Sequence, residues 1–181
     1  MSATASPIQL GRQADDELRA AVAAVTDPEI PVLTIADLGI LRDVHMAPDG
    51  QVEVIITPTY SGCPAMETIR ADIVQVLRRR GVDDVHVRVT LSPAWTTDWM
   101  SEDGKRKLRA YGVAPPTGRA PAPPGPVPVR LSVRSPLRPP VPCPQCGSSD
   151  TRETSRFGST ACKALYRCRS CLEPFDHFKA I

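Results

Sequence analysis

The sequence predicts an α/β protein of the α+β type: a small mixed-sheet domain, a proline-rich linker and a β-rich unit built around a metal ion. Helix-like and strand-like patterns alternate in residues 14–111, which predicts the mixed sheet. Prolines crowd residues 112–142, and two C-x-x-C pairs lie in residues 143–181. A chain of 181 residues can hold one domain of about 110 residues and a small module. We therefore expect two folded units, 14–111 and 143–181, joined by a linker.

Three helices are expected in the first unit. Apolar side chains recur at helical spacing in residues 14–25 and 64–80, and Gly81 suits the end of the second helix. The segment 101–111 opens on Ser101, whose hydroxyl favours the first position of a helix, and two acidic residues follow it. These helices supply the apolar faces that a sheet needs to form a core.

Three strands are expected beside these helices. Residues 40–46 and 52–57 flank an Ala-Pro-Asp-Gly turn, which is typical of a hairpin. Residues 85–91 alternate between apolar and polar side chains, which predicts a strand with one buried face. Together the strands predict one small sheet covered by helices.

The linker is predicted from its prolines. Of the 20 prolines in the chain, eleven lie in residues 112–142. Proline has no backbone N–H to donate, so this segment should form an extended spacer rather than a packed core. Residues 129–133 alternate weakly and could form a short strand.

Five of the six cysteines lie in the last thirty-nine residues. Cys143 and Cys146 form one C-x-x-C pair, and Cys168 and Cys171 form the other. This spacing predicts a four-thiolate metal site, because each knuckle presents two sulfurs to one ion. Zinc is expected there, although iron could occupy the same four-sulfur site. Disulfides are the less favoured alternative, because no secretion signal opens the chain.

Cys63 lies apart from the others, in a loop between the second predicted strand and the second predicted helix. Because Pro64 suits the first helical position, Cys63 should cap the helix, where backbone N–H groups favour the thiolate. Asp27, Glu29 and Asp37 are also predicted in loops, and they would converge on Cys63 if those loops share one edge of the sheet. A buried structural cysteine is an equally good interpretation, and Asp27 and Asp37 could instead stabilise turns.

Composition restricts the environment and the partners. The formal net charge of +2 does not indicate a nucleic-acid or membrane partner. We expect a cytoplasmic protein, since the chain shows neither a signal peptide nor an apolar run long enough to cross a bilayer. A nucleic-acid-binding ribbon stays open as a weak alternative because of five basic residues: Arg152, Arg156, Lys163, Arg167 and Arg169.

Three motifs resemble the small α/β domain of SufT-like and cytosolic iron–sulfur assembly proteins: DPEIPVLTIADLGILRDV, TPTYSGCPA and LSPAWTTDWM. With the C-terminal segment FGSTACKALYRCRSCLEPFDHFK, the chain resembles the PaaD family, the D component of bacterial phenylacetyl-CoA epoxidase (phenylacetate oxygenase) systems. The resemblance covers nearly the whole chain apart from its first residues and the linker. The linker is longer and richer in proline than we expect for that family.

The resemblance implies an accessory role in phenylacetate degradation, such as assembling or delivering an iron–sulfur or iron centre. The client would be another subunit of the epoxidase, above all the reductase that carries flavin and a [2Fe–2S] cluster. The sequence lacks di-iron helices, a flavin-binding G-x-G-x-x-G turn and plant-type ferredoxin spacing, so we expect no catalytic activity of its own. A noncatalytic structural or regulatory subunit is the alternative, and a homo-oligomer stays open.

The resemblance also implies roles for particular residues. Cys63 becomes the ligand of a transient iron or iron–sulfur cluster, with Asp27, Glu29 and Asp37 shaping its pocket. The C-terminal unit becomes a zinc ribbon held by the four knuckle cysteines. Cys162 could be a fifth ligand, a free thiol or, as we favour, a buried residue. The aromatic segment 175–178 could dock onto the oxygenase or pack onto the ribbon itself.

Overall fold

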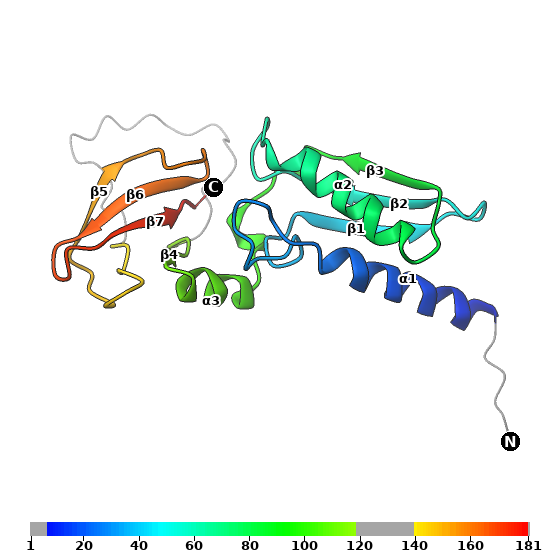
Figure 1. Cartoon of the computed structure of the whole chain (residues 1–181), viewed down its shortest axis with the longest axis horizontal. Helices are drawn as coiled ribbons and strands as arrows, with labels where there is room; N and C mark the ends of the chain where they lie inside the picture. The colour runs from blue at the N-terminus through cyan, green and yellow to red at the C-terminus, as the bar shows by residue number, and fades with distance from the viewer. Residues whose placement is uncertain (1–6, 119–139, 181) are drawn as a thin grey trace, which may run out of the picture. The chain divides into compact units, whose positions relative to one another are not determined.

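The computed structural model describes residues 7–118 and 140–180, with side chains from Asp15 onward (Figure 1). The chain divides into two compact units. Of the described residues, the first unit comprises 7–95 and 99–104, and the second comprises 96–98, 105–118 and 140–180. Residues 129–133, which could form a short strand, lie outside the described residues. Among the described residues, no helix is long and apolar enough to cross a membrane.

The first unit is a three-stranded mixed sheet with helices on one face. Strand β1 (Leu41–Met46) pairs antiparallel with β2 (Val52–Ile56), and β2 pairs parallel with β3 (Val85–Val89). The order is therefore β1-β2-β3, with β3 at an edge. Helices α1 (Pro7–Ala23) and α2 (Ala65–Arg78) contact each other, and they contact β1 and β3 respectively. This arrangement confirms the predicted mixed sheet.

Side chains alternate between the two faces along each strand, and one of these faces is buried. Val44, Val54 and Val87 lie opposite one another in the three strands, and all three side chains are buried. Along α2, the buried residues Met66, Ile69, Ile73 and Leu77 recur every three or four positions, as the sequence predicts, and Ala65 is buried beside Met66. The core thus lies between the α2 stripe and one face of the sheet.

Three loops meet at the same end of this sheet. Because β1 runs antiparallel to β2, and β3 runs parallel to it, the start of β1 and the ends of β2 and β3 coincide. Backbone hydrogen bonds from Thr57 to Ile40 (2.9 Å) and from Thr90 to Ile56 (2.9 Å) join the loops there. The loop before β1, which carries Asp27, Glu29 and Asp37, and the loop after β2, which carries Cys63, therefore lie at the same edge of the sheet, as expected.

Helix α3 (Glu102–Ala110) begins as the sequence predicts. The Ser101 hydroxyl accepts a hydrogen bond from the Gly104 N–H at 2.9 Å, which is the expected cap. A short 3-10 helix, Thr97–Trp99, precedes it. The division between the two units falls within α3.

The second unit is a four-stranded sheet of order β4-β7-β6-β5. Its long strands β5 (Thr151–Ser155), β6 (Lys163–Cys168) and β7 (Pro174–Phe178) are antiparallel neighbours. Strand β4 (Val113–Ala114) pairs parallel with β7, although we expected these two residues to belong to the linker. A strand of two residues is too short to show an alternation of apolar and polar side chains, so the sequence did not predict it.

The core of the second unit is small. Ala114, Val141, Cys143, Cys168 and Phe175 form its buried cluster, and Tyr166 and Cys171 pack against it. Phe178 is 1 % exposed. Of the two interpretations of the aromatic segment 175–178, packing onto the ribbon is therefore correct. Its phenylalanines are not available as a docking surface.

Candidate functional site

Four cysteine sulfurs converge in the second unit. The sulfur atoms of Cys143, Cys146, Cys168 and Cys171 all lie within 4.8 Å of one another. The sulfur of Cys143 lies 3.7 Å from that of Cys171, and the sulfur of Cys146 lies 3.6 Å from that of Cys168. Zinc–sulfur bonds of about 2.3 Å in a tetrahedron require sulfurs about 3.8 Å apart. The cluster therefore has the size that one tetrahedral zinc ion needs.

Two similar turns present these sulfurs. In the first turn the Gly147 N–H donates to the Cys143 carbonyl at 2.9 Å, and in the second the Cys171 N–H donates to the Cys168 sulfur at 3.5 Å. The residue after each pair has a positive φ, +76° at Gly147 and +66° at Leu172. Glycine adopts this conformation without strain, whereas leucine does not.

The four sulfurs interact strongly with one another. The backbone N–H of Cys171 is the main cause that lowers the pKa of Cys168 to about 6. At Cys171 the Glu173 N–H favours the thiolate, but desolvation and the neighbouring sulfurs outweigh it and raise the pKa to about 12. Crowded thiolates of this kind need a cation, which is the chemistry of a metal-binding set.

Cys63 lies in the first unit, directly before α2. Its sulfur accepts a hydrogen bond from the Ala65 N–H and interacts with the Tyr60 side chain. The Cys63 carbonyl accepts a hydrogen bond from the Met66 N–H at 3.3 Å. The thiol is half-buried. Helix α2 begins at Ala65, one residue later than expected, so Pro64 rather than Cys63 occupies the N-cap position.

The expectation that Cys63 has a lowered pKa is wrong. Desolvation is the largest effect and raises its pKa, and the negative charges of Glu29 and Asp27 raise it further. The hydrogen bonds from Ala65, which is the second-largest effect, and from Tyr60 lower the pKa but do not offset the other effects. The structure thus brings Asp27 and Glu29 into electrostatic range of the thiol, and there they disfavour the thiolate.

Asp27 and Asp37 also stabilise the loops that carry them. Asp27 Oδ1 accepts hydrogen bonds from the N–H groups of Glu29 (2.9 Å) and Ile30 (2.8 Å). Asp37 Oδ2 accepts from the N–H and hydroxyl of Thr34, both at 3.0 Å. These are the turn-stabilising roles that the sequence left open for both residues.

The loop before β1 is also fastened to the segment before α3. Asp37 Oδ1 accepts a hydrogen bond from the Ser101 hydroxyl at 3.1 Å, and the Trp95 indole N–H donates to the Leu38 carbonyl at 2.9 Å. A Cβ atom at Gly39 would lie 2.6 Å from the Trp99 carbonyl oxygen, so this approach requires glycine. The motifs DPEIPVLTIADLG and LSPAWTTDWM therefore form one packed structure.

Two notable residues of the segment that leads to Cys63 were not identified from the sequence. Tyr60 interacts with the thiol from within the same loop. Thr57 is 1 % exposed, and its hydroxyl has no hydrogen-bond partner among the described residues. Both lie in the motif TPTYSGCPA, which is the sequence feature that could have identified them. Their side-chain roles depend on packing that the motif does not reveal.

Cys162 lies outside the four-sulfur cluster. It is 6 % exposed, and its sulfur lies 3.0 Å from the Thr160 hydroxyl. The neighbouring Lys163 is 7 % exposed and pairs with Asp176 at 3.6 Å. The burial of Cys162 agrees with the interpretation that we favoured.

Comparison with known families matches both units. Residues 15–89 match the family described as iron-sulfur cluster assembly protein, and residues 131–179 match the PaaD zinc beta ribbon domain. A protein of Escherichia coli (strain K12), provisionally named as the D subunit of 1,2-phenylacetyl-CoA epoxidase, is 48% identical over 165 residues. The match covers 91% of this chain and 92% of that protein.

The first unit also has relatives of its own. An Fe-S protein maturation auxiliary factor of Porphyromonas gingivalis is 36% identical over 97 residues, which cover 53% of this chain and 91% of that protein. The crystal structure of a domain of unknown function, DUF59, from Bacillus anthracis superposes with a TM-score of 0.52 and 29% identity. That superposition covers 56% of this chain and 96% of the other. The chain belongs to the PaaD family, in which an iron–sulfur cluster assembly domain is followed by a zinc ribbon.

Proposed function

We propose that this protein is an accessory maturation factor of a phenylacetyl-CoA epoxidase system, binding iron or an iron–sulfur cluster transiently at Cys63 and delivering it to another subunit. One observation carries the proposal. A half-buried thiol, Cys63, lies at the loop end of the first sheet within electrostatic range of Asp27 and Glu29. The relatives of that domain include a protein named as an Fe-S protein maturation auxiliary factor.

The surroundings of Cys63 suit a cation as cargo. Asp27 and Glu29 repel the thiolate form of Cys63, and a positively charged iron centre would relieve that repulsion. Thr57 begins the loop that carries Cys63, and its side chain is buried. Both Asp37 oxygens already accept hydrogen bonds, so Asp37 positions the loop rather than binding the cargo.

The zinc site has a different role. Zinc held by Cys143, Cys146, Cys168 and Cys171 leaves no coordination position for a substrate, which is typical of a structural ion. Its four thiolates must stay reduced to hold the metal, which suits the cytoplasm. We therefore assign folding of the ribbon to zinc, and transient iron chemistry to Cys63.

The client that we favour is the flavin and [2Fe–2S] reductase of the epoxidase. The Escherichia coli relative is named as an epoxidase subunit, whereas the shorter relative is named for maturation of iron–sulfur proteins. A factor that loads a cluster into one epoxidase subunit would satisfy both names. On this proposal the chain itself is not a catalyst.

Deletion of the gene tests this function. We expect the reductase isolated from cells without this protein to be deficient in [2Fe–2S] absorbance and the epoxidase to turn over slowly. Chemical reconstitution with iron and sulfide should then restore turnover without this protein. Fully loaded enzyme that still requires stoichiometric amounts of this chain would show that it is a working subunit.

That second function, a noncatalytic subunit of the assembled complex, is favoured by the word subunit in the name of the Escherichia coli relative. It predicts co-purification at a fixed stoichiometry, whereas a maturation factor should dissociate from its loaded client. A nucleic-acid partner is less favoured still, because two of the basic ribbon residues, Lys163 and Arg169, pair with Asp176 and Asp150.

A further inference from the structure

We infer that the free edge of β3 is a docking site where an acidic, extended segment of another protein adds as a further strand. The inference does not depend on the cargo proposed for Cys63. It rests on an edge of the strand that pairs with no other strand among the described residues, on the basic groove beside it and on the lack of acidic residues in segments 1–6 and 119–139 of this chain.

The edge of β3 is open among the described residues. The strand contacts only β2 and α2 among the helices and strands of the structure. The Asp84 carbonyl accepts from the Val52 N–H, and the Thr90 N–H donates to the Ile56 carbonyl. In a parallel pair the groups facing the partner alternate along the strand. The N–H and C=O groups of the odd-numbered residues Val85, Val87 and Val89 therefore point away from β2.

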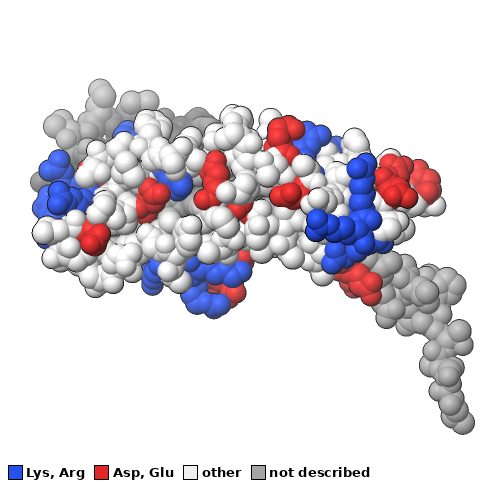
Figure 2. All heavy atoms as spheres, in the orientation of Figure 1, with Lys and Arg blue, Asp and Glu red and all other residues white. Residues whose placement is uncertain are grey.

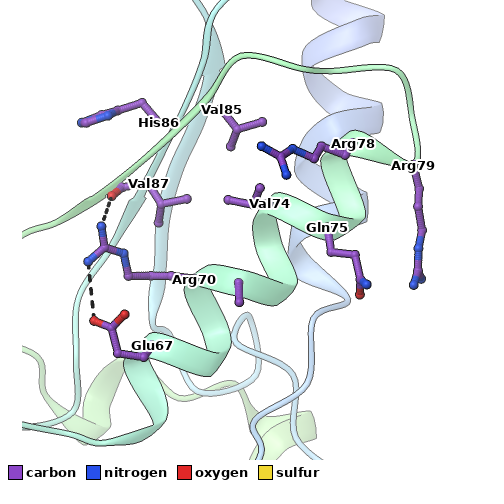
Figure 3. A pocket seen from close by; sticks show the side chains of 10 residues that line it. Glu67, Arg70, Val74, Gln75, Arg78, Arg79, Val85, His86 and Val87 are labelled. Atoms are coloured by element: carbon purple, nitrogen blue, oxygen red, sulfur yellow. Dashed lines mark hydrogen bonds and ion pairs between the residues drawn. The ribbon is translucent and has the colours of Figure 1, made fainter.

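A groove of about 880 Å³ runs between this edge and α2 (Figure 3). Val85 and Val87 line it from the strand, and Ala71 and Val74 line it from the helix. Val89 and Leu91 extend the apolar surface beyond it, because their side chains are 38% and 61% exposed. An added strand would bury part of this apolar surface while pairing its backbone with β3.

The groove is basic. Arg70, Arg78 and Arg79 line it, against the single acidic side chain Glu67. Arg70 donates to the Val87 carbonyl at 3.4 Å, so a guanidinium already lies at the free edge. In Figure 3 Arg70 and Arg78 extend from α2 toward β3, whereas Arg79 points away. Figure 2 shows Lys and Arg side chains gathered over the C-terminal part of α2.

The positive charge of the groove indicates which kind of segment can bind there. Residues 1–6 and 119–139 contain no aspartate or glutamate, and the second of these segments contains four arginines. Neither segment therefore complements the groove. A second copy pairing edge to edge through β3 would place Arg70 and Arg78 of both copies along one interface, where like charges repel. The partner that fits is an extended segment of another protein with acidic residues at alternate positions.

Nuclear magnetic resonance on the isotope-labelled full chain tests this inference. The probe is a short peptide in which glutamate alternates with threonine and valine, and its control carries lysine for every glutamate. We expect the acidic peptide to shift the amide signals of Val85, Val87 and Val89 and to slow hydrogen exchange there. The lysine peptide should leave these signals unchanged. Added salt should weaken the acidic complex.

Two sets of variants separate charge from backbone pairing. The double variant Arg70→Glu and Arg78→Glu should weaken binding of the acidic peptide by about tenfold or more. Arg80→Glu, a single charge reversal outside the groove, should change it by less than about twofold. Val89→Pro should also weaken binding, because it removes an outward N–H and leaves the even-numbered bonds to β2 in place. Val89→Thr, which keeps that N–H, should bind normally.

Several results would overturn the inference. The site would be excluded if the lysine peptide bound equally well, or if the peptide shifted only the amide signals of residues outside β3. It would also be excluded if the Arg70 and Arg78 double variant bound the acidic peptide with unchanged affinity. Broadening of the β3 signals with protein concentration alone would identify a second copy as the occupant. Tighter binding of a single-stranded oligonucleotide than of the acidic peptide would identify nucleic acid instead.

Discussion

The cysteines of the two units lie in opposite kinds of surroundings. In the ribbon, four sulfurs lie within 4.8 Å of one another, and two of them, Cys143 and Cys168, belong to the buried core. In the first unit, the sulfur of Cys63 is half-buried in a loop, and its charged neighbours are Asp27 and Glu29. We therefore expect the ribbon to depend on its sulfurs for folding, whereas the first unit has an extensive apolar core that does not involve Cys63.

This difference shows how to separate structural from functional thiols. A structural metal site closes around its ion and contributes to the core, so its loss should appear as unfolding. A cargo site must stay accessible, and the fold around it should not depend on the cargo. The first unit meets that condition because the Asp27 and Asp37 carboxylates accept backbone hydrogen bonds that hold its loops.

The largest expected effect is loss of the ribbon. Cys143→Ser should release zinc and unfold the second unit, because zinc contributes about 10–16 kcal/mol in small domains of this kind. The first unit should remain folded. Metal analysis and the amide spectrum of the full chain measure both outcomes. Cys162→Ser is the matched control, since Cys162 is buried but lies outside the cluster, and it should retain one zinc ion.

The next effect should appear in the first unit alone. Leu77→Ala removes a fully buried side chain of α2 and should lower the free energy of unfolding of that unit by about 2–5 kcal/mol. Zinc content should not change. Leu91→Ala, at a position 61% exposed, should cost less than about 0.5 kcal/mol in the same denaturant titration. Equal losses for both variants would contradict the assigned core.

A smaller loss is expected at the start of α3. Ser101→Ala removes the hydroxyl that caps Gly104 and donates to Asp37, and it should cost about 1–2 kcal/mol. Ser61→Ala, at an exposed position, serves as the control. Thermal unfolding of both variants compares the two serines. A neutral effect at Ser101 would show that the Asp37 loop is held by its other contacts.

The smallest effect concerns the ionisation of Cys63. Because its pKa is raised in the folded protein, its alkylation by iodoacetamide should require higher pH than that of an unfolded thiol. The protonated thiol stabilises the fold below the unfolded pKa, and this contribution is lost as pH rises through the raised value. Glu29→Gln should lower the pKa and increase the alkylation rate near pH 8 by about two- to fivefold. An unchanged rate would place Glu29 outside the environment of the thiol.

Periodic segments of the sequence predicted the fold well. The α2 stripe, the alternation in β3 and the Ser101 cap all follow from local spacing, and the structure contains them within a few residues of the expected bounds. The C-x-x-C spacing likewise predicted the four-sulfur cluster, because a knuckle is a local structure. These features depend on neighbours along the chain, which the sequence displays directly.

Features that depend on distant residues were not predictable. The pairing of Val113–Ala114 with β7 joins segments about 60 residues apart, so no local pattern marks it. The raised pKa of Cys63 depends on desolvation by the folded structure and, to a smaller extent, on carboxylates more than thirty residues away, whereas the helix start alone suggested the opposite direction. The burial of Phe175 in one cluster with Val141 likewise depends on tertiary contacts between distant residues.

The central claim is that Cys63 handles iron while the ribbon holds zinc. Anaerobic incubation of the full chain with ferrous iron and sulfide, followed by desalting and measurement of iron and zinc per chain, tests it directly. We expect iron to be retained by the unaltered chain and by Cys162→Ser but not by Cys63→Ser, with one zinc ion in all three. Equal iron in Cys63→Ser, or iron gained only as zinc is lost, would contradict the claim.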